Sequence, residues 1–433
     1  MQLRSSRGGE DVAFLKAIDL GIAPDGGLFV PVGDLRLPPP PTALSMDFQA
    51  TAAWALRHLL AEEIETPVLD RLVAAAFDFP VPVGRLGAGP SLLNLTRGPT
   101  RAFKDIGARF LAGLWALNPV PLGRTVLVAT SGDTGGAVAD ACAGLPGIRV
   151  VVLFPERGVS SIQRRQFTTL GGNVFAVAVE GPFDRCQALV KEAFGDPALT
   201  SAHQLTSANS INIGRILPQI LPYLHLARLN GWSVVNPEGQ PGTVVVPSGN
   251  LGNVWGAMMA RRAGAPLGQV VAACNRNDTL VRWLNDRSCT AQPSVPTPSS
   301  AMDVGRPSNL ERVSVLMDQG EALSAHTVSD SETHDAIRKS AAAGRVVDPH
   351  TAVGLVIAEQ LIADGMDPAS VTVVETASPA KFPEVLAEAG VAAPTDPVLL
   401  LNEGRPERIL TLSGGGSLSA LLAGMADDAG PLA

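Results

Sequence analysis

Apolar residues recur with helical spacing over residues 97–117, RGPTRAFKDIGARFLAGLWAL. They form one continuous face of the predicted helix: Phe103, Ile106, Phe110, Leu114 and Leu117. Lys104 lies on a neighbouring apolar stripe, whereas Asp105 and Arg109 remain on the polar side. The pattern therefore predicts a buried helix whose first turn directs a lysine inward.

Two effects lower the pKa of a lysine in this position. The N-terminus of a helix carries partial positive charge, and burial disfavours the charged form of an amine. A neutral lysine amine is a nucleophile that forms a Schiff base with an aldehyde. The alternative is an ordinary lysine at a helix end whose ammonium group extends into water, and this stretch by itself favours that alternative.

From residue 124 onward, short apolar runs alternate with helical segments. Strands are expected at 124–129, 149–154, 173–180 and 243–247, each followed by a helix, at 134–144, 160–169, 183–195 and 253–264. Further strands are expected at 269–274 and 371–375. The alternation predicts an α/β fold in which right-handed βαβ units form parallel sheets.

The first 85 residues predict a separate, mainly helical N-terminal domain. We expect a helix over 10–21, a Gly-rich turn into a short strand over 24–31, and a helix over 45–60 with Ser45 as its N-cap. Later in the chain, residues 286–300 form a polar, Pro-rich loop, and long loops of this kind are commonly functional or mobile.

Composition excludes several classes of protein. No apolar run reaches the roughly 20 residues of a membrane helix, and the first twenty residues do not read as a secretory signal, so we expect a cytoplasmic protein without a membrane partner. The net charge of −8 comes without a basic block, which argues against a nucleic-acid partner. Cys142, Cys186, Cys274 and Cys289 lack metal-ligand spacing, so we expect reduced thiols and no metal site.

Two loops share one design. TSGDTGG (130–136) and SGNLGN (248–253) each stand between an expected strand and an expected helix. Such loops expose backbone N–H groups at a helix N-terminus, and their glycines let an anion approach closely. Neither loop matches a nucleotide-binding motif. A tight βα turn without a ligand is the alternative for either loop alone.

A third stretch, SANSINIGR (207–215), combines polar capping residues with Arg215 at the start of an expected helix that continues to residue 229. Guanidinium, hydroxyl and amide groups at a helix N-terminus suit a phosphate group. An ordinary capped helix with an exposed arginine is the alternative. Together with Lys104, the three stretches predict a site that holds a phosphorylated aldehyde on lysine and a second anion on the substrate.

The sequence resembles the threonine synthases, pyridoxal 5′-phosphate (PLP) enzymes of fold type II, over nearly the whole chain. The motifs that carry the resemblance are LRSSRG, GIAPDGGLFVP, GPTRAFKD, TSGDTG, SANSINIGR, PSGNLGN, NRNDT, AMDVGRPSN, DPHTAVG and TASPAKF. The resemblance implies two parallel-sheet domains behind the N-terminal domain of residues 1–85. A small βαβ domain (124–215) would be inserted in a large PLP-binding domain (86–123 and 216–433).

The resemblance also implies roles for individual residues. Lys104 would bind the PLP aldehyde and act as the catalytic base, Asp133 would contact the phenolic side of the ring, and Thr376 would face the pyridine nitrogen. The phosphate of the cofactor would be held by the second loop: Ser248, Gly249, Asn250, Leu251, Gly252 and Asn253. The substrate would be held by Ser131, Thr134, Asn209, Ser210, Arg215 and Arg97.

The implied activity is a lyase reaction that eliminates phosphate from O-phospho-L-homoserine, adds water at the β-carbon and yields threonine, in a monomer or homodimer. Two positions depart from the family pattern, because Arg97 and Ser378 stand where histidines are usual. Drift at these positions is one explanation, and a related enzyme for another activated amino acid is the other. A catalytically silent phosphate-binding protein is a third hypothesis, against which Lys104 argues.

Overall fold

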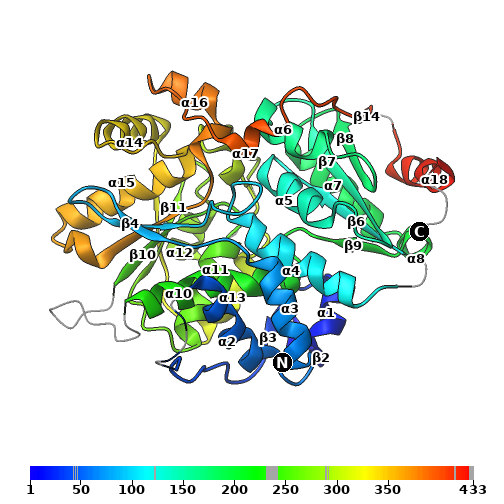
Figure 1. Cartoon of the computed structure of the whole chain (residues 1–433), viewed down its shortest axis with the longest axis horizontal. Coiled ribbons are helices and arrows are strands. Elements are labelled where there is room, and N and C mark those ends of the chain that lie inside the picture. The colour runs from blue at the N-terminus through cyan, green and yellow to red at the C-terminus, as the bar shows by residue number, and fades with distance from the viewer. Residues whose placement is uncertain are drawn as a thin grey trace.

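A computed structural model describes residues 1–41, 43, 45, 47–120, 123–230, 242–287, 290, 292–413 and 416–428 (Figure 1). Three separate sheets organise these residues. Two of them are built mainly or entirely from parallel strands, and the helices between their strands lie on both faces. The α/β fold class expected from the sequence is therefore confirmed.

The six-stranded sheet has the order β12-β11-β10-β13-β5-β4. Its strands are β4 (Val83–Arg85), β5 (Ser91–Asn94), β10 (Thr243–Pro247), β11 (Val270–Cys274), β12 (Ser324–Thr327) and β13 (Val371–Glu375). All neighbours are parallel except β4 and β5. The central strands are runs of valine and alanine because helices cover both of their faces.

The five-stranded sheet is entirely parallel, with the order β14-β8-β7-β6-β9. Its strands are β6 (Arg124–Ala129), β7 (Ile148–Pro155), β8 (Val174–Val179), β9 (Leu205–Ser207) and β14 (Ile409–Leu412). The strands expected from apolar runs in both sheets are confirmed to within a residue or two. The sequence did not predict β4, β5, β9, β12 or β14, which are three to four residues long.

The division into three domains stays a prediction. Two strands pair with strands that this division assigns to a different domain. Strand β4 precedes residue 86 yet pairs with β5 in the six-stranded sheet. Strand β14 was placed with the large domain but pairs with β8 at the edge of the other sheet (Figure 1). An exposed edge strand carries too little apolar pattern to reveal its partner in the sequence.

The N-terminal region is less helical than expected. It contains the antiparallel sheet β2-β1-β3, made of β1 (Gln2–Ser5), β2 (Gly8–Ala13) and β3 (Phe29–Pro31). The helix expected over 10–21 therefore begins only at Phe14, because residues 8–13 pair with β1. The other helices here are α1 (Phe14–Leu20), α2 (Phe48–Leu60) and α3 (Thr66–Ala76).

The N-cap of α2 is Asp47, not Ser45. The Asp47 carboxylate accepts the backbone N–H of Ala50, and the Ser45 hydroxyl donates to that carboxylate. The expected helix from 213 to 229 is also divided, because Pro218 and Pro222 lack the N–H group that an uninterrupted helix needs. Its parts are α9 (Ile213–Ile216), the 3-10 turn η1 (Leu217–Ile220) and α10 (Leu221–Leu229).

The remaining helices surround the two parallel sheets. They are α4 (Lys104–Leu117), α5 (Asp133–Cys142), α6 (Ser161–Thr168), α7 (Phe183–Phe194), α8 (Pro197–His203), α11 (Gly252–Arg262), α12 (Thr279–Asp286), α13 (Leu310–Asp318), α14 (Asp330–Ala342), α15 (Pro349–Ala363), α16 (Pro383–Glu388), α17 (Pro397–Leu400) and α18 (Leu418–Asp428). Short 3-10 turns are η2 (Ser300–Met302), η3 (Pro368–Ser370) and η4 (Pro379–Lys381).

Helix α4 lies at the centre of the molecule and packs against α3, α5 and α9 (Figure 1). Ile106, Phe110 and Leu114 of its predicted apolar face are buried, whereas Phe103 just before the helix is partly buried and Leu117 is exposed. Asp105, which we expected on a polar face, is also buried, because its carboxylate accepts the Thr100 N–H and hydroxyl and closes the turn before the helix.

Cys142, Cys186 and Cys274 are buried free thiols, whereas Cys289 lies outside the described residues. Within the described ranges, the helices are all too short or too polar to cross a membrane.

Candidate active site

A cavity opens where loops from both parallel sheets meet, at the carboxyl ends of β6, β10 and β13. Such crevices are the usual ligand sites of open α/β sheets. It encloses about 1030 Å³ of atom-free space, part of it open to solvent. Every residue expected at the site except Arg97 lines it: Lys104, Ser131, Asp133, Thr134, Asn209, Ser210, Arg215, Ser248, Gly249, Asn250, Leu251, Gly252, Asn253 and Thr376.

Lys104 is the first residue of α4, and its side chain is 14% exposed and faces the cavity. Its Nζ lies 3.5 Å from Asp133 Oδ2 and 4.9 Å from the centre of the Phe103 ring. Burial lowers the pKa of Lys104, and the neighbouring cations Lys381 and Arg215 act in the same direction, against the attraction of Asp133. The side chain is therefore suited to react as a neutral amine.

Asp133, at the start of α5, is the electrostatic centre of the site. Burial by itself would raise the pKa of its carboxyl group, but the charges of Lys381 and Lys104 hold that pKa well below its ordinary value. Lys381 Nζ lies 2.7 Å from Asp133 Oδ1, and Gln163 donates to the same oxygen at 2.8 Å. Sequence reasoning assigned neither Lys381 nor Gln163 to the site, although Lys381 lies within the quoted motif TASPAKF.

The SGNLGN loop fits a bound phosphate group. Leu251 adopts a left-handed conformation, with φ at 62°, that turns the chain into α11. A Cβ on Gly249 would lie 2.7 Å from Met302 Cα, so only glycine lets these backbones approach so closely. Asn253 Nδ2 is buried beside the cavity without a partner among the described residues. An unsatisfied donor at a helix N-terminus suits an anionic group.

The TSGDTGG loop is shaped by Thr130. The Thr130 hydroxyl oxygen accepts the N–H groups of Gly132 at 2.9 Å and Gly135 at 2.8 Å. Two of the backbone donors that the sequence offered to an anion are thus already engaged. Ser131 and Thr134 line the cavity. This loop therefore offers a ligand its side chains and only part of its backbone.

The SANSINIGR stretch contributes mainly through Arg215. The side chain is buried, its Nη1 donates to Ala208 O at 3.0 Å, and its Nε has no partner among the described residues. Burial lowers the pKa of Arg215 to about 10, so the guanidinium remains charged at neutral pH. Because α9 is only four residues long, little of the expected helix dipole supports an anion here.

Asn209 and Ser210 line the cavity but are partly committed to the fold. The Asn209 side chain bridges the Ala129 backbone, accepting its N–H at 3.2 Å and donating to its carbonyl at 2.8 Å. Ser210 Oγ accepts hydrogen bonds from Asn250 at 2.6 Å and Asn309 at 3.0 Å. These bonds join the SANSINIGR stretch to the SGNLGN loop, and Asn309 is a further residue that sequence reasoning missed.

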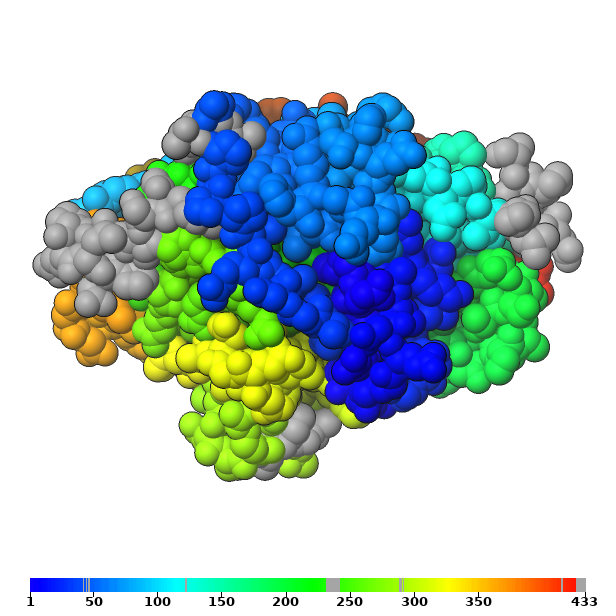
Figure 2. Space-filling model, turned by 90° about the horizontal axis from the view of Figure 1, so that it is seen from below, coloured from blue at the N-terminus to red at the C-terminus, as the bar shows by residue number. Residues whose placement is uncertain are grey.

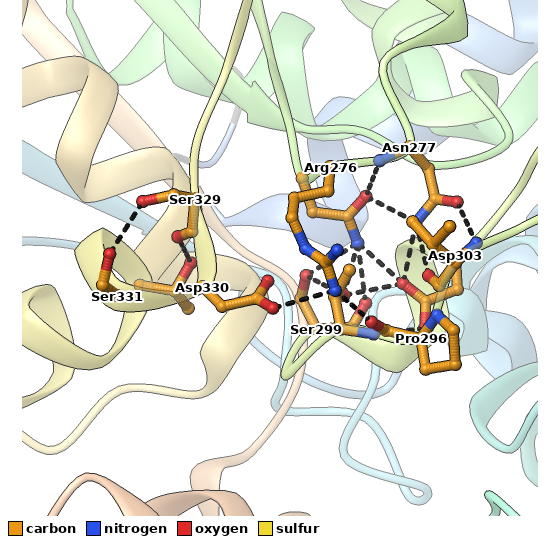
Figure 3. A network of polar contacts seen from close by, with 12 residues as sticks. Arg276, Asn277, Pro296, Ser299, Asp303, Ser329, Asp330 and Ser331 are labelled. Carbon is orange, nitrogen blue, oxygen red and sulfur yellow. Dashed lines mark hydrogen bonds and ion pairs between the residues drawn. The ribbon is translucent and has the colours of Figure 1, made fainter.

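A polar network holds the segment that covers Gly249 (Figure 3). Asp303 accepts hydrogen bonds from Asn275 at 2.9 Å, Asn277 at 3.1 Å and the Thr297 hydroxyl at 2.6 Å. Arg276 donates to Pro296 O and pairs with Asp330 at 3.0 Å. The end of the predicted loop 286–300 and the three residues after it are therefore held beside the site by these hydrogen bonds.

His350 also lines the cavity, although sequence reasoning assigned it no role. Its Nε2 accepts the Ala301 N–H at 3.2 Å, which leaves the ring proton on Nδ1, 2.7 Å from Asp348 Oδ1. The ring thereby supports the same segment that covers Gly249. The motif DPHTAVG contains both His350 and Asp348, but Ala301, the partner of Nε2, lies 49 residues away in the sequence.

Arg97 and Ser378 do not reach the cavity. Arg97 is exposed, contrary to the expectation that it contacts the substrate, because the turn before α4 directs it to the surface. Ser378 is buried against Asp396, with Oγ 3.4 Å from Oδ2, and that carboxylate pairs with Arg101 at 3.0 Å. Neither of the two residues that depart from the family pattern therefore lines the cavity.

A second, wider cavity adjoins the first and shares Ala129, Gln187, Asn209 and Asn250 with it. It lies between the N-terminal residues, α7 and α13. Arg7 crosses to Glu311 of α13 at 2.9 Å, and the blue N-terminal residues lie beside the yellow α13 region on the face seen in Figure 2. This space forms an approach to the site from the surface.

Comparison with known proteins agrees with this geometry. Residues 92–376 match the family model described as "Pyridoxal-phosphate dependent enzyme". The chain is 40% identical to a threonine synthase of Serratia marcescens and 39% identical to that of Escherichia coli, with 87% of each chain covered in both comparisons.

Solved structures agree as well. The crystal structure of threonine synthase from Escherichia coli superposes with a TM-score of 0.87 at 35% identity, covering 98% of this chain and all of that one. The PLP-bound threonine synthase from Brucella melitensis gives a TM-score of 0.85 at 30% identity, covering 97% and 98%. The chain therefore belongs to the threonine synthase family of pyridoxal-phosphate-dependent enzymes.

Proposed function

We propose that this chain is a threonine synthase, which converts O-phospho-L-homoserine and water into L-threonine and phosphate. The observation that carries the proposal is the position of Lys104, a partly buried lysine with a lowered pKa, in one cavity with the SGNLGN loop and with Arg215 of the SANSINIGR stretch. When bound, PLP supplies an aldehyde that captures amino groups and a ring that stabilises negative charge on substrate carbons.

Residues of this chain have distinct tasks in the proposed reaction. Ser248–Asn253 would hold the cofactor phosphate, and Thr376, which lines the same cavity, would face the pyridine nitrogen. Lys104 would hold the cofactor through its Nζ, and the same Nζ would accept the proton of the substrate α-carbon and return it to another carbon of the substrate. Asp133 orients that amine across 3.5 Å.

The substrate phosphate is assigned to Arg215, Ser131 and Thr134, with Asn209 and Ser210 shaping the site. Arg215 offers a permanent charge with a buried, unpaired Nε. A preorganised cation stabilises the charge that builds on the leaving phosphate. The wider cavity gives the charged substrate a path from the surface.

The test is turnover of O-phospho-L-homoserine by the purified holoenzyme. We expect threonine and phosphate in equal amounts, and no product from the Lys104→Ala variant. Phosphate release without threonine, or threonine at the rate of that variant, would refute the proposal. Other activated serines and homoserines serve as comparison substrates, and faster turnover of one of them would favour a related enzyme.

We further propose that the enzyme works in the cytoplasm as a monomer or homodimer, with small molecules as its partners. The net charge of −8 and the lack of a membrane-spanning helix among the described residues support this assignment. Light scattering on the purified chain measures the mass, and a particle larger than a dimer would contradict the proposal.

A further inference from the structure

Two lysines, the fully buried Lys381 and the partly buried Lys104, face a single carboxylate beside the cavity. Lys381 Nζ lies 2.7 Å from Asp133 Oδ1, and Lys104 Nζ lies 3.5 Å from Asp133 Oδ2. The Lys381 side chain is 0% exposed, and its Nζ also donates to Thr100 O at 2.8 Å. The side chain therefore has no contact with bulk solvent, and Asp133 is the carboxylate in direct contact with its ammonium group, whereas the buried Asp105 carboxyl group interacts with that charge without contact.

One carboxylate neutralises one ammonium group. Burying a charge without a counter-ion is costly, so the closer pair, Asp133 and Lys381, is expected to be the balanced one. Protonation of Lys104 would then add a second positive charge to the same pocket, where Arg215 already contributes one. With Asp133 paired to Lys381, an uncharged Lys104 avoids adding an ammonium group beside Lys381 and Arg215.

The position of Lys381 is fixed from both parallel sheets. Lys381 ends η4, which follows β13 of the six-stranded sheet. Ser160, at the N-cap of α6 in the other layer, donates to Lys381 O at 2.9 Å. Gln163 from the same helix donates to the Asp133 oxygen that Lys381 contacts. The ion pair is thus held at the junction where the cavity forms.

We propose that Lys381 is a positioning residue that acts on Lys104 through Asp133: it supplies the counter-charge of that carboxylate and leaves the amine of Lys104 without a counter-ion of its own. The proposal deepens the proposed function and rests on Lys104 as the residue that binds PLP. Lys381 does not line the cavity and reaches Lys104 only across Asp133, so its influence on the amine is electrostatic.

Substitution of Lys381 tests the proposal in the holoenzyme. In Lys381→Met and in Lys381→Gln, which keeps a donor for Thr100 O, Asp133 becomes the counter-ion of Lys104. The pH midpoint of the cofactor absorbance band should rise by at least about one unit, a tenfold change in an ionisation constant. The acidic limb of kcat against pH should move in the same direction.

Two further variants show that the effect passes through Asp133. In an Asp133→Asn background, adding Lys381→Met should shift the midpoint by a smaller amount than it does with Asp133 present, because only the direct repulsion between the two lysines is then removed. Gln163→Met is the matched control, because it removes a neutral donor from the same oxygen, and its midpoint should move by less than about 0.3 unit. Equal losses of kcat at every pH, with unchanged midpoints, would show that Lys381 is only structural.

The wild-type holoenzyme provides a test that needs no substitution at Lys381. The chain has five lysines, Lys16, Lys104, Lys191, Lys339 and Lys381, so carbon-13 labelling at Cε yields few signals. Lys→Arg variants of the three exposed lysines assign the spectrum. Lys381, which contacts the Asp133 carboxylate at 2.7 Å, should report an ammonium group in the holoenzyme, and a neutral amine would overturn the proposal.

Neither the absorbance titration nor the spectrum requires substrate. If the wild-type protein fails to turn over O-phospho-L-homoserine, the proposed function is wrong while the role of Lys381 is still decided by the midpoints. If the midpoints stay fixed while turnover is normal, the role of Lys381 is wrong and the proposed function stands.

Discussion

Arg215→Met tests the assignment of the substrate phosphate. Methionine keeps much of the side-chain volume but removes a charge that is buried, unpaired at Nε and retained at neutral pH because the pKa is lowered only to about 10. Loss of a desolvated charge pair weakens binding by roughly 2 to 5 kcal/mol. At about 1.4 kcal/mol per tenfold change, kcat/KM for O-phospho-L-homoserine should fall roughly 30- to 5000-fold.

The fold should tolerate this substitution. The bond from Arg215 Nη1 to Ala208 O is lost, which costs about 1 to 3 kcal/mol, while the penalty for burying the guanidinium disappears. The free energy of unfolding should therefore change by less than about 2 kcal/mol, and the Kd for PLP by less than about threefold.

The assays are phosphate release at saturating PLP, an absorbance titration with PLP and urea unfolding. Arg124→Met is the matched control, since Arg124 is equally buried, pairs with Asp19 at 3.0 Å and does not line the cavity. It should lower stability by about 1 to 3 kcal/mol and leave kcat/KM within about twofold. Equal losses of PLP affinity and kcat/KM in Arg215→Met would place Arg215 in the cofactor site and refute the reasoning.

Three other substitutions probe the loops around the site. Gly249→Ala should weaken PLP binding and lower the free energy of unfolding by about 1 to 3 kcal/mol, because its Cβ would lie 2.7 Å from the neighbouring backbone. The control is Gly424→Ala in α18, where no atom lies within 4 Å of the new Cβ, and it should raise the free energy of unfolding by about 0.5 to 1 kcal/mol. Calorimetry measures both changes in stability. Burial raises the pKa of Asp105 to about 6, so the folded protein keeps a proton that the unfolded chain has released, and stability should fall as pH rises from 4 to 6. Asp105→Asn should remove this slope in urea titrations, and an unchanged slope would assign it to another group. Arg97→His combined with Ser378→His should leave kcat/KM within about twofold, and a larger gain would revive the hypothesis of altered specificity.

Several site features could be predicted because they follow strands. The loops at 130–136 and 248–253 come directly after β6 and β10, and the carboxyl ends of parallel strands meet at one crevice. Helical periodicity likewise indicated that Lys104 points inward. These inferences need only neighbours within a few residues of each other in the chain.

Other features depend on segments that are far apart. Lys381 reaches Asp133 across 248 residues of sequence, and Ser378 faces Asp396 and Arg101 instead of the cavity. Asp105 seemed polar by periodicity but is buried, because the preceding turn supplies its donors. No local sequence pattern predicts which distant side chain will pair with a buried charged group.

The sequence by itself determined the type and position of the long buried elements, since burial on both faces of a strand or one face of a helix imposes a repeating apolar pattern. It also indicated the chemistry of the loops that follow those strands. Only the tertiary structure decided the edge pairing of β14, the N-terminal sheet and the sharing of Asp133 between two lysines. These features arise from contacts between segments that are far apart along the chain. Such contacts form only when the core packs, so they leave no periodic pattern in the sequence.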